Sequence, residues 1–296
     1  MSVPETLTLA LLREAEFKGP QLGVLGDPIA HSLSPAMHNA AIAALVPTHP
    51  KLAGLHYHRL HITAAELSLA LPLLRNKGFI GLNLTVPHKI QALELVTQLS
   101  PEARQAASVN TLTIDGAGWA GHTTDGRGFI EALRENSGHS VQGRDIILLG
   151  AGGAARAVAA ACLTENCRSL KVYNRDGARA QGLAEALHDP RVSAHEISKL
   201  GLPSLDAIIV NCTTLGLKAS DSSPLPAELL QPGQFIFDTT YGSSPAQLIR
   251  DARAKGISHC DGRAMLRWQG ALAFQLWTGT LPPAAPMRQA LGEPAL

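Results

Sequence analysis

Short apolar runs alternate with helical stretches along most of the chain. The runs that predict strands lie at 23–26, 55–61, 79–86, 145–149, 170–173, 207–211 and 234–238. Helices are expected between these runs, including one over 34–45, which would take Ser34 as its N-cap and Pro35 as its first helical residue. Another is expected over 263–278. This alternation is typical of α/β proteins with mostly parallel sheets.

Local signals refine the pattern. Residues 109–114 and 119–122 flank Asp115-Gly116, which predicts a hairpin. Thr63 and Glu66 have the spacing of a capping box, and Pro72 should kink or split the helix that follows. Residues 7–12 indicate a short N-terminal helix. The segment after Leu281 is rich in Pro and Ala, and we expect it to be frayed.

Length and charge narrow the possibilities. A chain of 296 residues favours about two domains. Lys and Arg number 25 against 24 Asp and Glu, so no global basic field favours nucleic acid or anionic lipid. The N-terminal apolar stretch is too short to span a membrane and lacks the features of a signal peptide. The four cysteines form no Cys-x-x-Cys pair, so we expect reduced thiols in a cytoplasmic protein.

A glycine-rich loop follows the apolar strand 145–149. Gly150-x-Gly152-x-x-Ala155 after a strand and before an Ala-rich helix is the dinucleotide-binding fingerprint. Its glycines allow backbone amides to approach a pyrophosphate at a helix N-terminus. We therefore predict a doubly wound, Rossmann-type parallel sheet that binds a nicotinamide cofactor.

The residues after the next strand bear on cofactor choice. An acid that would bind the ribose 2′-hydroxyl of NAD is replaced by Asn174, and two guanidinium groups follow at Arg175 and Arg179. Arginine matches phosphate geometry, which favours NADP. Asp176 opposes this preference, because its carboxylate would repel a 2′-phosphate. NADP is the prediction, with NAD as the alternative.

A second polar motif follows the strand at 79–86. Asn83 and Thr85 share one strand face, and Lys89 lies beyond Pro87 at the start of a helix. A lysine is electrostatically misplaced at a helix N-terminus, which favours a functional role.

Further polar strings lie where other strands end, at 31–35, 108–111 and 122–126. Their hydroxyls and amides suit a ligand with several hydroxyl groups and a carboxylate. Ser32 and Ser34 form a candidate carboxylate cradle.

Two groups of residues are read as structural. His56, His58 and His61 lack a nearby carboxylate or cysteine that would complete a metal site, so we expect an exposed strand face and no metal. Trp268 and Trp277 are expected to pack in the core or between domains.

Taken together, these motifs resemble those of the shikimate dehydrogenase family, and the resemblance covers nearly the whole length of the chain. The motifs that carry the resemblance occur in the family's order: 26–35, 83–89, 108–111, 124–126, 150–154, 174–175, 238–241 and 261–269. The order of several motifs is more specific than any one of them.

The resemblance implies reversible NADPH-dependent reduction of 3-dehydroshikimate to shikimate, a step of the chorismate pathway to aromatic amino acids. Lys89 and Asp125 would form the catalytic pair. The residues implied to bind the substrate are Ser32, Ser34, Asn83, Thr85, Asn110, Asp125, Tyr241 and Gln269. Those implied to bind the cofactor are Gly150, Ala151, Gly152, Gly153, Ala154, Asn174, Arg175, Arg179, Thr239 and Gly262.

The resemblance also implies two domains. An N-terminal mixed α/β substrate domain would comprise 1–125, completed by the C-terminal helix 262–280, with the Rossmann domain at 126–261 and a tail at 281–296. The small-molecule substrate would be the main partner, and the protein a monomer or homodimer.

Three positions depart from the family's usual residues: Thr123, Asp176 and Thr239. They leave open a quinate/shikimate dehydrogenase that also uses NAD. A non-catalytic homologue that senses a metabolite or dinucleotide is a separate alternative, which the presence of both Lys89 and Asp125 disfavours.

Overall fold

The computed structural model describes residues 5–242 and 244–293. The chain forms two compact units. Unit 1 comprises Met1–Thr124 with Gln269–Leu296, and unit 2 comprises Asp125–Trp268. Both are α/β, as predicted.

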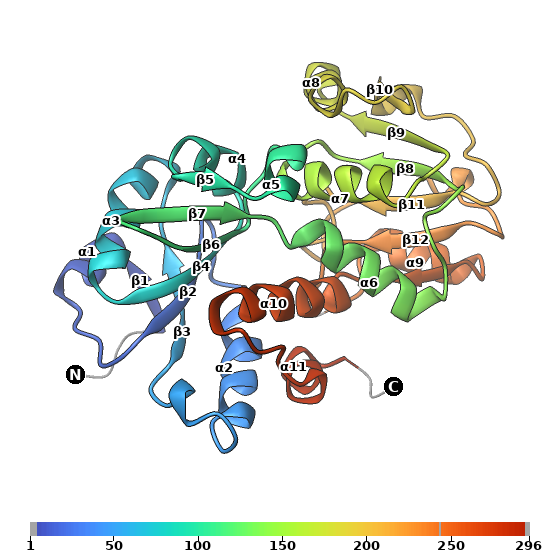
Figure 1. The fold of residues 1–296 in the computed structure, drawn as a ribbon. Coiled ribbons are helices and arrows are strands. Elements are labelled where there is room, and N and C mark those ends of the chain that lie inside the picture. The colour runs from blue at the N-terminus through green and yellow to red at the C-terminus, as the bar shows by residue number, and fades with distance from the viewer. Residues whose placement is uncertain (1–4, 243, 294–296) are drawn as a thin grey trace. The chain divides into compact units, whose positions relative to one another are not determined.

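Unit 1 contains a seven-stranded sheet in the order β1-β3-β2-β4-β6-β7-β5 (Figure 1). The strands are β1 (Thr6–Thr8), β2 (Gln21–Gly26), β3 (His56–His61), β4 (Phe79–Leu84), β5 (Gln98–Leu99), β6 (Thr111–Asp115) and β7 (Gly118–His122). Strands β1 to β4 pair in parallel, whereas β6 is antiparallel to both β4 and β7. The hairpin predicted at Asp115-Gly116 is thereby confirmed.

The helices of unit 1 pack on both faces of this sheet. They are α1 (Leu9–Glu14), α2 (Ser34–Leu45), α3 (Leu67–Asn76), α4 (His88–Gln91), α5 (Pro101–Ala106) and α11 (Ala284–Leu291), with short 3-10 turns η1 (Pro50–Leu52), η2 (Ala64–Glu66) and η3 (Ala92–Glu94). Leu25 and Leu82 share one apolar cluster with Leu71 of α3. On the opposite face, Val24 clusters with Ile42 of α2, because alternate strand residues point to opposite sides.

Two local expectations for unit 1, the N-cap of α2 and the frayed C-terminal segment, are wrong. Ser34 is the first residue of α2 rather than its N-cap, which is Leu33. Of the two effects expected of Pro72, a kink or a split, the split does not occur, because α3 continues through this residue. Part of the segment expected to be frayed forms α11, whose Met287 and Leu291 are buried. The capping box of Thr63 and Glu66 is confirmed.

Unit 2 contains six parallel strands in the order β10-β9-β8-β11-β12-β13. The strands are β8 (Asp145–Leu149), β9 (Ser169–Asn174), β10 (Val192–Glu196), β11 (Ile208–Asn211), β12 (Phe235–Asp238) and β13 (Ser258–Cys260). Numbered from β8, the order is 3-2-1-4-5-6, that of the Rossmann fold. Figure 1 shows β9, β8, β11 and β12 lying one beside the next.

The helices of unit 2 cover this sheet. They are α6 (Asp125–Ser137), α7 (Gly153–Thr164), α8 (Gly177–Leu187) and α9 (Gln247–Ala254), with 3-10 turns η4 (Ile197–Lys199) and η5 (Ala227–Leu229). Phe129 of α6 and Val158 of α7 pack on one face, and Leu248 of α9 packs on the other.

Helix α10 (Arg263–Thr278) belongs to both units, because the boundary falls within it between Trp268 and Gln269. The division expected from sequence placed this helix with the substrate domain alone. Its first turns pack Met265 and Trp268 into unit 2. Its later turns pack Phe274 and Trp277 into unit 1. Both tryptophans are half-buried and pack against these core clusters, in line with the packing role predicted for them.

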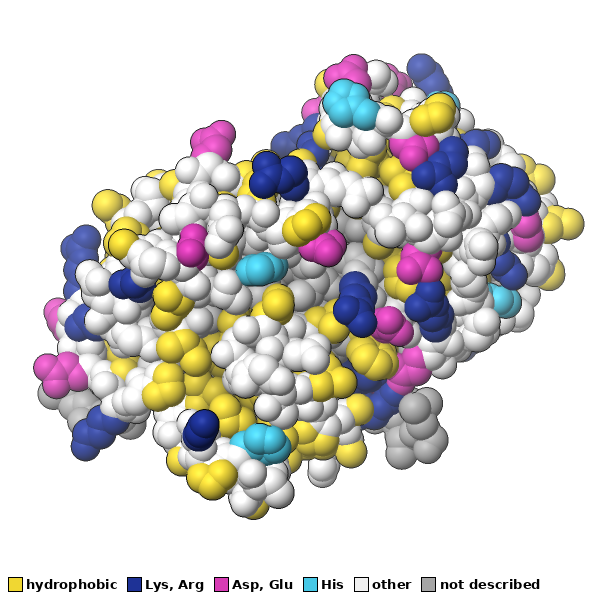
Figure 2. Space-filling view, in the orientation of Figure 1, with side chains coloured by type: hydrophobic (Ala, Val, Ile, Leu, Met, Phe, Trp, Pro, Cys, Tyr) yellow, Lys and Arg dark blue, Asp and Glu magenta, His cyan; other side chains and the backbone are white. Residues whose placement is uncertain are grey.

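The surface reflects the near-neutral charge balance of the sequence. On the face that Figure 2 shows, Lys and Arg side chains are interspersed with Asp and Glu side chains. Among the described residues, none of the helices combines the length and the apolar character that crossing a bilayer requires.

Candidate functional site

Asn83, at the end of β4, is buried, and its amide is held by protein groups. Its Oδ1 accepts a hydrogen bond from the Tyr57 hydroxyl at 2.8 Å. Its Nδ2 donates to the carbonyl of Asn110 and to Oγ1 of Thr111, both at 3.1 Å. The Asn83 side chain, on β4, is therefore hydrogen-bonded to Tyr57 of β3, to Thr111 of β6 and to Asn110, the residue that precedes β6.

Asn110 is the centre of this buried network. Its Oδ1 accepts from the backbone N–H of Thr124 at 2.8 Å and from the Thr111 hydroxyl at 2.9 Å. Its Nδ2 donates to Oε1 of Gln269 at 3.2 Å and to Oγ1 of Thr124 at 3.0 Å. Two residues predicted to bind one ligand, Asn110 and Gln269, are thus in direct contact although they are far apart in the chain.

Lys89 is half-buried in the single turn of α4, next to an anchored histidine. His88 is fully buried, and its Nε2 donates to the carbonyl of Ile62 at 2.8 Å. Burial lowers the pKa of His88, so the ring is neutral at physiological pH. The carbonyl of Lys89 accepts from the N–H of Val109 at 2.8 Å. This contact joins the lysine motif to the segment that carries Asn110.

Thr85 links the lysine motif to β2, the strand that leads to the serines. Its backbone N–H donates to the carbonyl of Leu25 at 2.9 Å. Beyond β2, the hydroxyl of Ser32 accepts from the N–H of Ser34 at 3.3 Å. Helix α2 has no side-chain hydrogen bond from its N-cap residue. Of the first two residues of α2, Ser34 already donates its N–H to Ser32 and Pro35 has no N–H, so a carboxylate cradle here would depend chiefly on the two serine hydroxyls.

Two aromatic residues in unit 1 were not predicted from the sequence. Tyr57 is fully buried and stacks on His38 of α2, with ring centroids 4.2 Å apart and planes 8° apart. Both ring nitrogens of His38 lack a hydrogen-bond partner in the described structure, and burial lowers its pKa to about 3. The available signal was the alternation of β3, which directs Tyr57 to the face opposite His56 and His58.

The histidines of β3 form the exposed face that we expected only in part, because His56 is exposed whereas His58 is buried. His58 is buried against Phe17 and Phe79, and its Nε2 donates to Oε1 of Gln21 at 2.7 Å. Burial, with a smaller contribution from His56, lowers the pKa of His58 to about 4. In the described part of the chain, no cluster of His, Cys, Asp and Glu is placed to hold a metal ion.

In unit 2, the glycine loop has the geometry that the fingerprint requires. Gly150 has φ of +107°, and a Cβ there would lie 2.9 Å from the carbonyl oxygen of Cys212. Helix α7 has Gly152 as its N-cap and no side-chain hydrogen bond at that cap. The amides of Gly153 and Ala154 begin this helix, at the place where the fingerprint would hold a pyrophosphate.

After the adjacent strand, a cavity of about 420 Å³ is lined by Asn174, Arg175, Asp176 and Arg179. These residues follow β9, the strand whose end meets the adenosine ribose in Rossmann folds. Nδ2 of Asn174 donates to the carbonyl of Asp176 at 3.0 Å. The guanidinium groups predicted from the sequence therefore line one pocket, and these two groups fit a 2′-phosphate, whereas the Asp176 carboxylate beside them opposes it.

The loops after β11 and β12 are joined by two buried residues to which no role was assigned from the sequence, Asn211 and Asp238. Oδ1 of Asp238 accepts from Nδ2 of Asn211 at 3.0 Å, and from the N–H and hydroxyl of Thr240 at 2.9 and 2.8 Å. The signal for both was a polar residue ending each apolar strand, and Asp238 also opens the motif 238–241. This arrangement fixes Thr239, whose N–H donates to the carbonyl of Asn211 at 2.9 Å.

Gly262, which follows β13, contacts the loop after β12, and Tyr241 belongs to that loop. The N–H of Gly262 donates to the carbonyl of Thr240 at 3.0 Å, and a Cβ at Gly262 would collide with the carbonyl of Thr239. Tyr241 follows in the loop after β12 and is half-buried. Asp125 is the first residue of α6, and it is 4% exposed.

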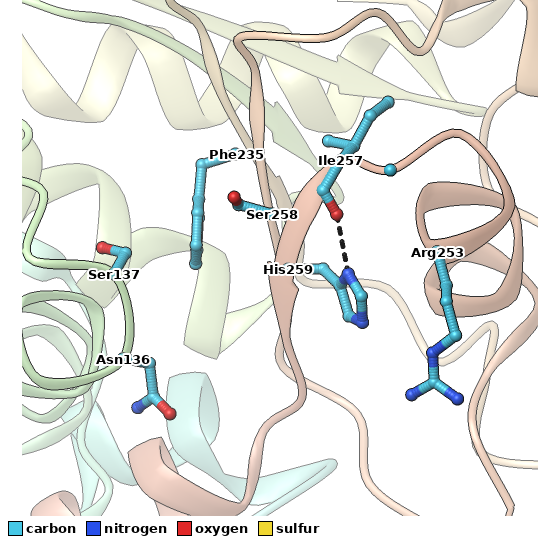
Figure 3. Close-up of a pocket in the computed structure, with 8 residues that line it drawn as sticks. Asn136, Ser137, Phe235, Arg253, Ile257, Ser258 and His259 are labelled. Carbon is cyan, nitrogen blue, oxygen red and sulfur yellow. Dashed lines mark hydrogen bonds between the residues drawn. The ribbon is translucent and has the colours of Figure 1, made fainter.

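A second depression in unit 2, of about 500 Å³ (Figure 3), lies at the amino ends of β12 and β13. Its lining includes Phe235 and Ser258, the first residues of β12 and β13, and His259, whose Nδ1 donates to the carbonyl of Ile257 at 2.7 Å. Ligands of parallel α/β sheets bind at the carboxyl ends of the strands. No residue predicted for the site lines this depression.

Comparison with known proteins identifies the family. The chain matches the shikimate dehydrogenase substrate-binding domain over residues 24–112, the shikimate/quinate 5-dehydrogenase model over 132–219 and the shikimate 5′-dehydrogenase C-terminal domain over 262–291. It is 42% identical to the NADP(+) shikimate dehydrogenase of Rubrobacter xylanophilus over 278 residues, which cover 91% of this chain and 94% of that protein.

Solved structures agree with the sequence match. The shikimate 5-dehydrogenase of Thermus thermophilus, in complex with NADP(H) and shikimate, is 38% identical, with a TM-score of 0.79 over 92% of this chain and 98% of that one. A quinate dehydrogenase of Corynebacterium glutamicum in complex with NAD is 29% identical, also with a TM-score of 0.79, over 92% of this chain and 98% of that one. With a Rossmann strand order, a fingerprint loop and these matches, the chain belongs to the shikimate dehydrogenase family of oxidoreductases.

Proposed function

We propose that the protein catalyses the reversible NADPH-dependent reduction of 3-dehydroshikimate to shikimate. The observation that carries this proposal is the buried amide network in which Asn110 contacts Gln269 directly. Amide groups can both donate and accept hydrogen bonds, as recognition of ring hydroxyls requires. The shikimate dehydrogenases among the relatives support the same substrate.

In this proposal, substrate groups are shared among residues with different roles. Ser32, Ser34 and Tyr241 would bind the carboxylate. Thr85, Asn110, Asp125 and Gln269 would bind the ring hydroxyls. Asn83 would act largely by orienting Asn110, because its amide is engaged by Tyr57, Asn110 and Thr111. The amide of Asn110 is also engaged, and its bond to Gln269 is the one that a ring hydroxyl would replace.

Lys89 would be the proton donor. The bound cofactor supplies a hydride to the ketone carbon, and the oxygen then needs a proton. The Lys89 ammonium can stabilise the developing charge on that oxygen and deliver the proton. The anchored ring of His88 and the contact from Val109 fix the backbone that carries it. Asp125 is proposed as its catalytic partner from the family resemblance.

Cofactor binding would fall to unit 2. The amides of 150–154 would hold the pyrophosphate, and Arg175 and Arg179 the 2′-phosphate, with Asn174 beside them. Thr239 and Gly262 would lie beside the nicotinamide. The open N-terminus of α7 and the arginine-lined cavity support NADP. A cytoplasmic location and a monomeric or homodimeric state stay predictions.

The test is an absorbance assay at the nicotinamide band, in which shikimate and quinate are each combined with NADP and NAD. We expect the fastest oxidation with shikimate and NADP. Lys89→Met should lower kcat/KM by about 10²–10⁴-fold, while NADP binding is retained. Lys51→Met, which alters an exposed lysine of the same unit, serves as the matched control.

Each contrary outcome has a distinct meaning. Turnover of quinate with NAD at a comparable rate would favour the second candidate, a quinate/shikimate dehydrogenase, for which the resemblance to a quinate dehydrogenase is the specific support. A complete lack of turnover in every combination would favour a sensing homologue. Full activity in Lys89→Met would remove the lysine from the mechanism.

A further inference from the structure

Asp176 places a carboxylate in the arginine-lined cavity, and its hydrogen bonds show how it is held there. It is the N-cap residue of α8, and its Oδ1 accepts from the backbone N–H groups of Ala178 at 3.0 Å and Arg179 at 3.4 Å. Its Oδ2 lies 3.8 Å from Nε of Arg179. The acid is therefore directed toward the helix that follows it.

These contacts use groups that a 2′-phosphate would also need. The first N–H groups of a helix carry a partial positive charge and attract anions. Arg179 is one of the two guanidinium groups that line the cavity, and Arg175 is the other. Asp176 thus occupies part of the positive end of the pocket.

We propose that Asp176 is an internal anion that competes with the cofactor's 2′-phosphate for Arg179 and for the N-terminus of α8. By this competition Asp176 limits the preference for NADP over NAD. This inference rests on the proposed function, because it assumes that the cavity receives the adenosine end of the cofactor. NAD lacks the 2′-phosphate, so the carboxylate should affect NADP far more strongly.

Substitutions at this position can separate charge from helix capping. Asn and Thr both retain an oxygen that caps a helix, whereas neither carries a charge. Removing the negative charge should tighten binding of a 2′-phosphorylated nucleotide. Because the site is exposed, we expect a gain of about tenfold, which corresponds to about 1.4 kcal/mol.

The surroundings provide a matched control. Glu196, at the end of β10, approaches the same turn, since a Cβ at Gly177 would lie 3.0 Å from its Cγ. Glu196 accepts from the hydroxyl of Ser198 and does not cap α8. Glu196→Gln therefore removes one negative charge from the same neighbourhood without altering the proposed competitor.

The experiment is isothermal titration calorimetry of the full chain with 2′,5′-ADP and with 5′-ADP, which reports binding without turnover. Asp176→Asn and Asp176→Thr should each lower the Kd for 2′,5′-ADP about tenfold and change the Kd for 5′-ADP less than about twofold. Glu196→Gln should change either Kd less than about twofold. Thermal melts of each variant test whether α8 keeps its stability.

The outcomes distinguish this inference from the proposed function. If the wild type binds 2′,5′-ADP and neither Asp176 variant improves on it, the inference is overturned and the proposed function stands. An equal gain in Glu196→Gln would also overturn it, because general charge would then suffice. If the wild type binds neither nucleotide at millimolar concentration, the proposed function fails and this inference fails with it.

Discussion

Replacing Asp238 with Asn should change how the stability of unit 2 depends on pH. Asp238 is fully buried, and its Oδ2 has no hydrogen-bond partner among the described residues. Burial raises its pKa from 3.8 to about 6, with a smaller contribution from the Asp261 carboxylate, which itself pairs with Arg263. The hydrogen bonds from Thr240 and Asn211 oppose this rise but do not cancel it.

The sign and the magnitude follow from linkage. The folded state holds this proton more tightly than the unfolded state, so Asp238 lowers stability as pH rises from about 4 through about 6. The full effect is about 3 kcal/mol, of which about 1.4 kcal/mol falls between pH 5 and pH 7.5. The Asp238→Asn variant would have no such dependence, and any cost of its buried amide would be the same at each pH.

The measurement is urea unfolding followed by circular dichroism at pH 5, 6 and 7.5. From pH 5 to pH 7.5, the Asp238→Asn variant should gain about 1.4 kcal/mol relative to the wild type. Asp189→Asn is the control in the same unit, since Arg191 holds the pKa of Asp189 at about 2 and its effect lies below this range. Parallel profiles for the wild type and Asp238→Asn would refute a carboxyl with a raised pKa at this position.

Two further predictions address the substrate and cofactor residues separately. Tyr57→Phe removes the hydroxyl that donates to Asn83, and a buried acceptor left unpaired costs about 1–3 kcal/mol. The KM for shikimate should therefore rise about tenfold, while the Kd for NADP stays unchanged in titrations. An unchanged KM would show that Tyr57 does not orient the network. Gly150→Ala forces a side chain into a backbone with φ of +107° and against the carbonyl of Cys212. Calorimetry should therefore show at least about a tenfold weaker NADP affinity, with shikimate binding intact. Wild-type NADP affinity in this variant would contradict the assigned role of the loop.

Periodicity and end signals predicted the elements that are amphipathic and locally capped. The last helix of the alternating pattern was expected over 263–278 and is observed as Arg263–Thr278. The capping box at Thr63 was also recognisable, because both of its partners lie within four residues of sequence. These features depend on short-range chemistry that a sequence displays directly.

Features that depend on register were not accessible in the same way. The burial of His58 results from its position between β2 and the phenyl rings of Phe17 and Phe79. Likewise, Tyr57 and Asp238 acquire their roles from residues on other strands. The helix at 284–291 was missed because its stability comes from the packing of Met287 and Leu291, which a Pro- and Ala-rich segment does not reveal by itself.

The division of the chain within α10 has a consequence for synthesis on the ribosome. Unit 2 is one continuous segment, Asp125–Trp268, so all of its residues have been made before the last part of unit 1 is translated. Until then the growing unit 1 lacks the indole of Trp277, which packs against Gly81 of β4, and Gln269, which pairs with Asn110. The nucleotide-binding half can therefore fold vectorially, while the substrate-binding half must wait for the C-terminal residues before its polar network can close.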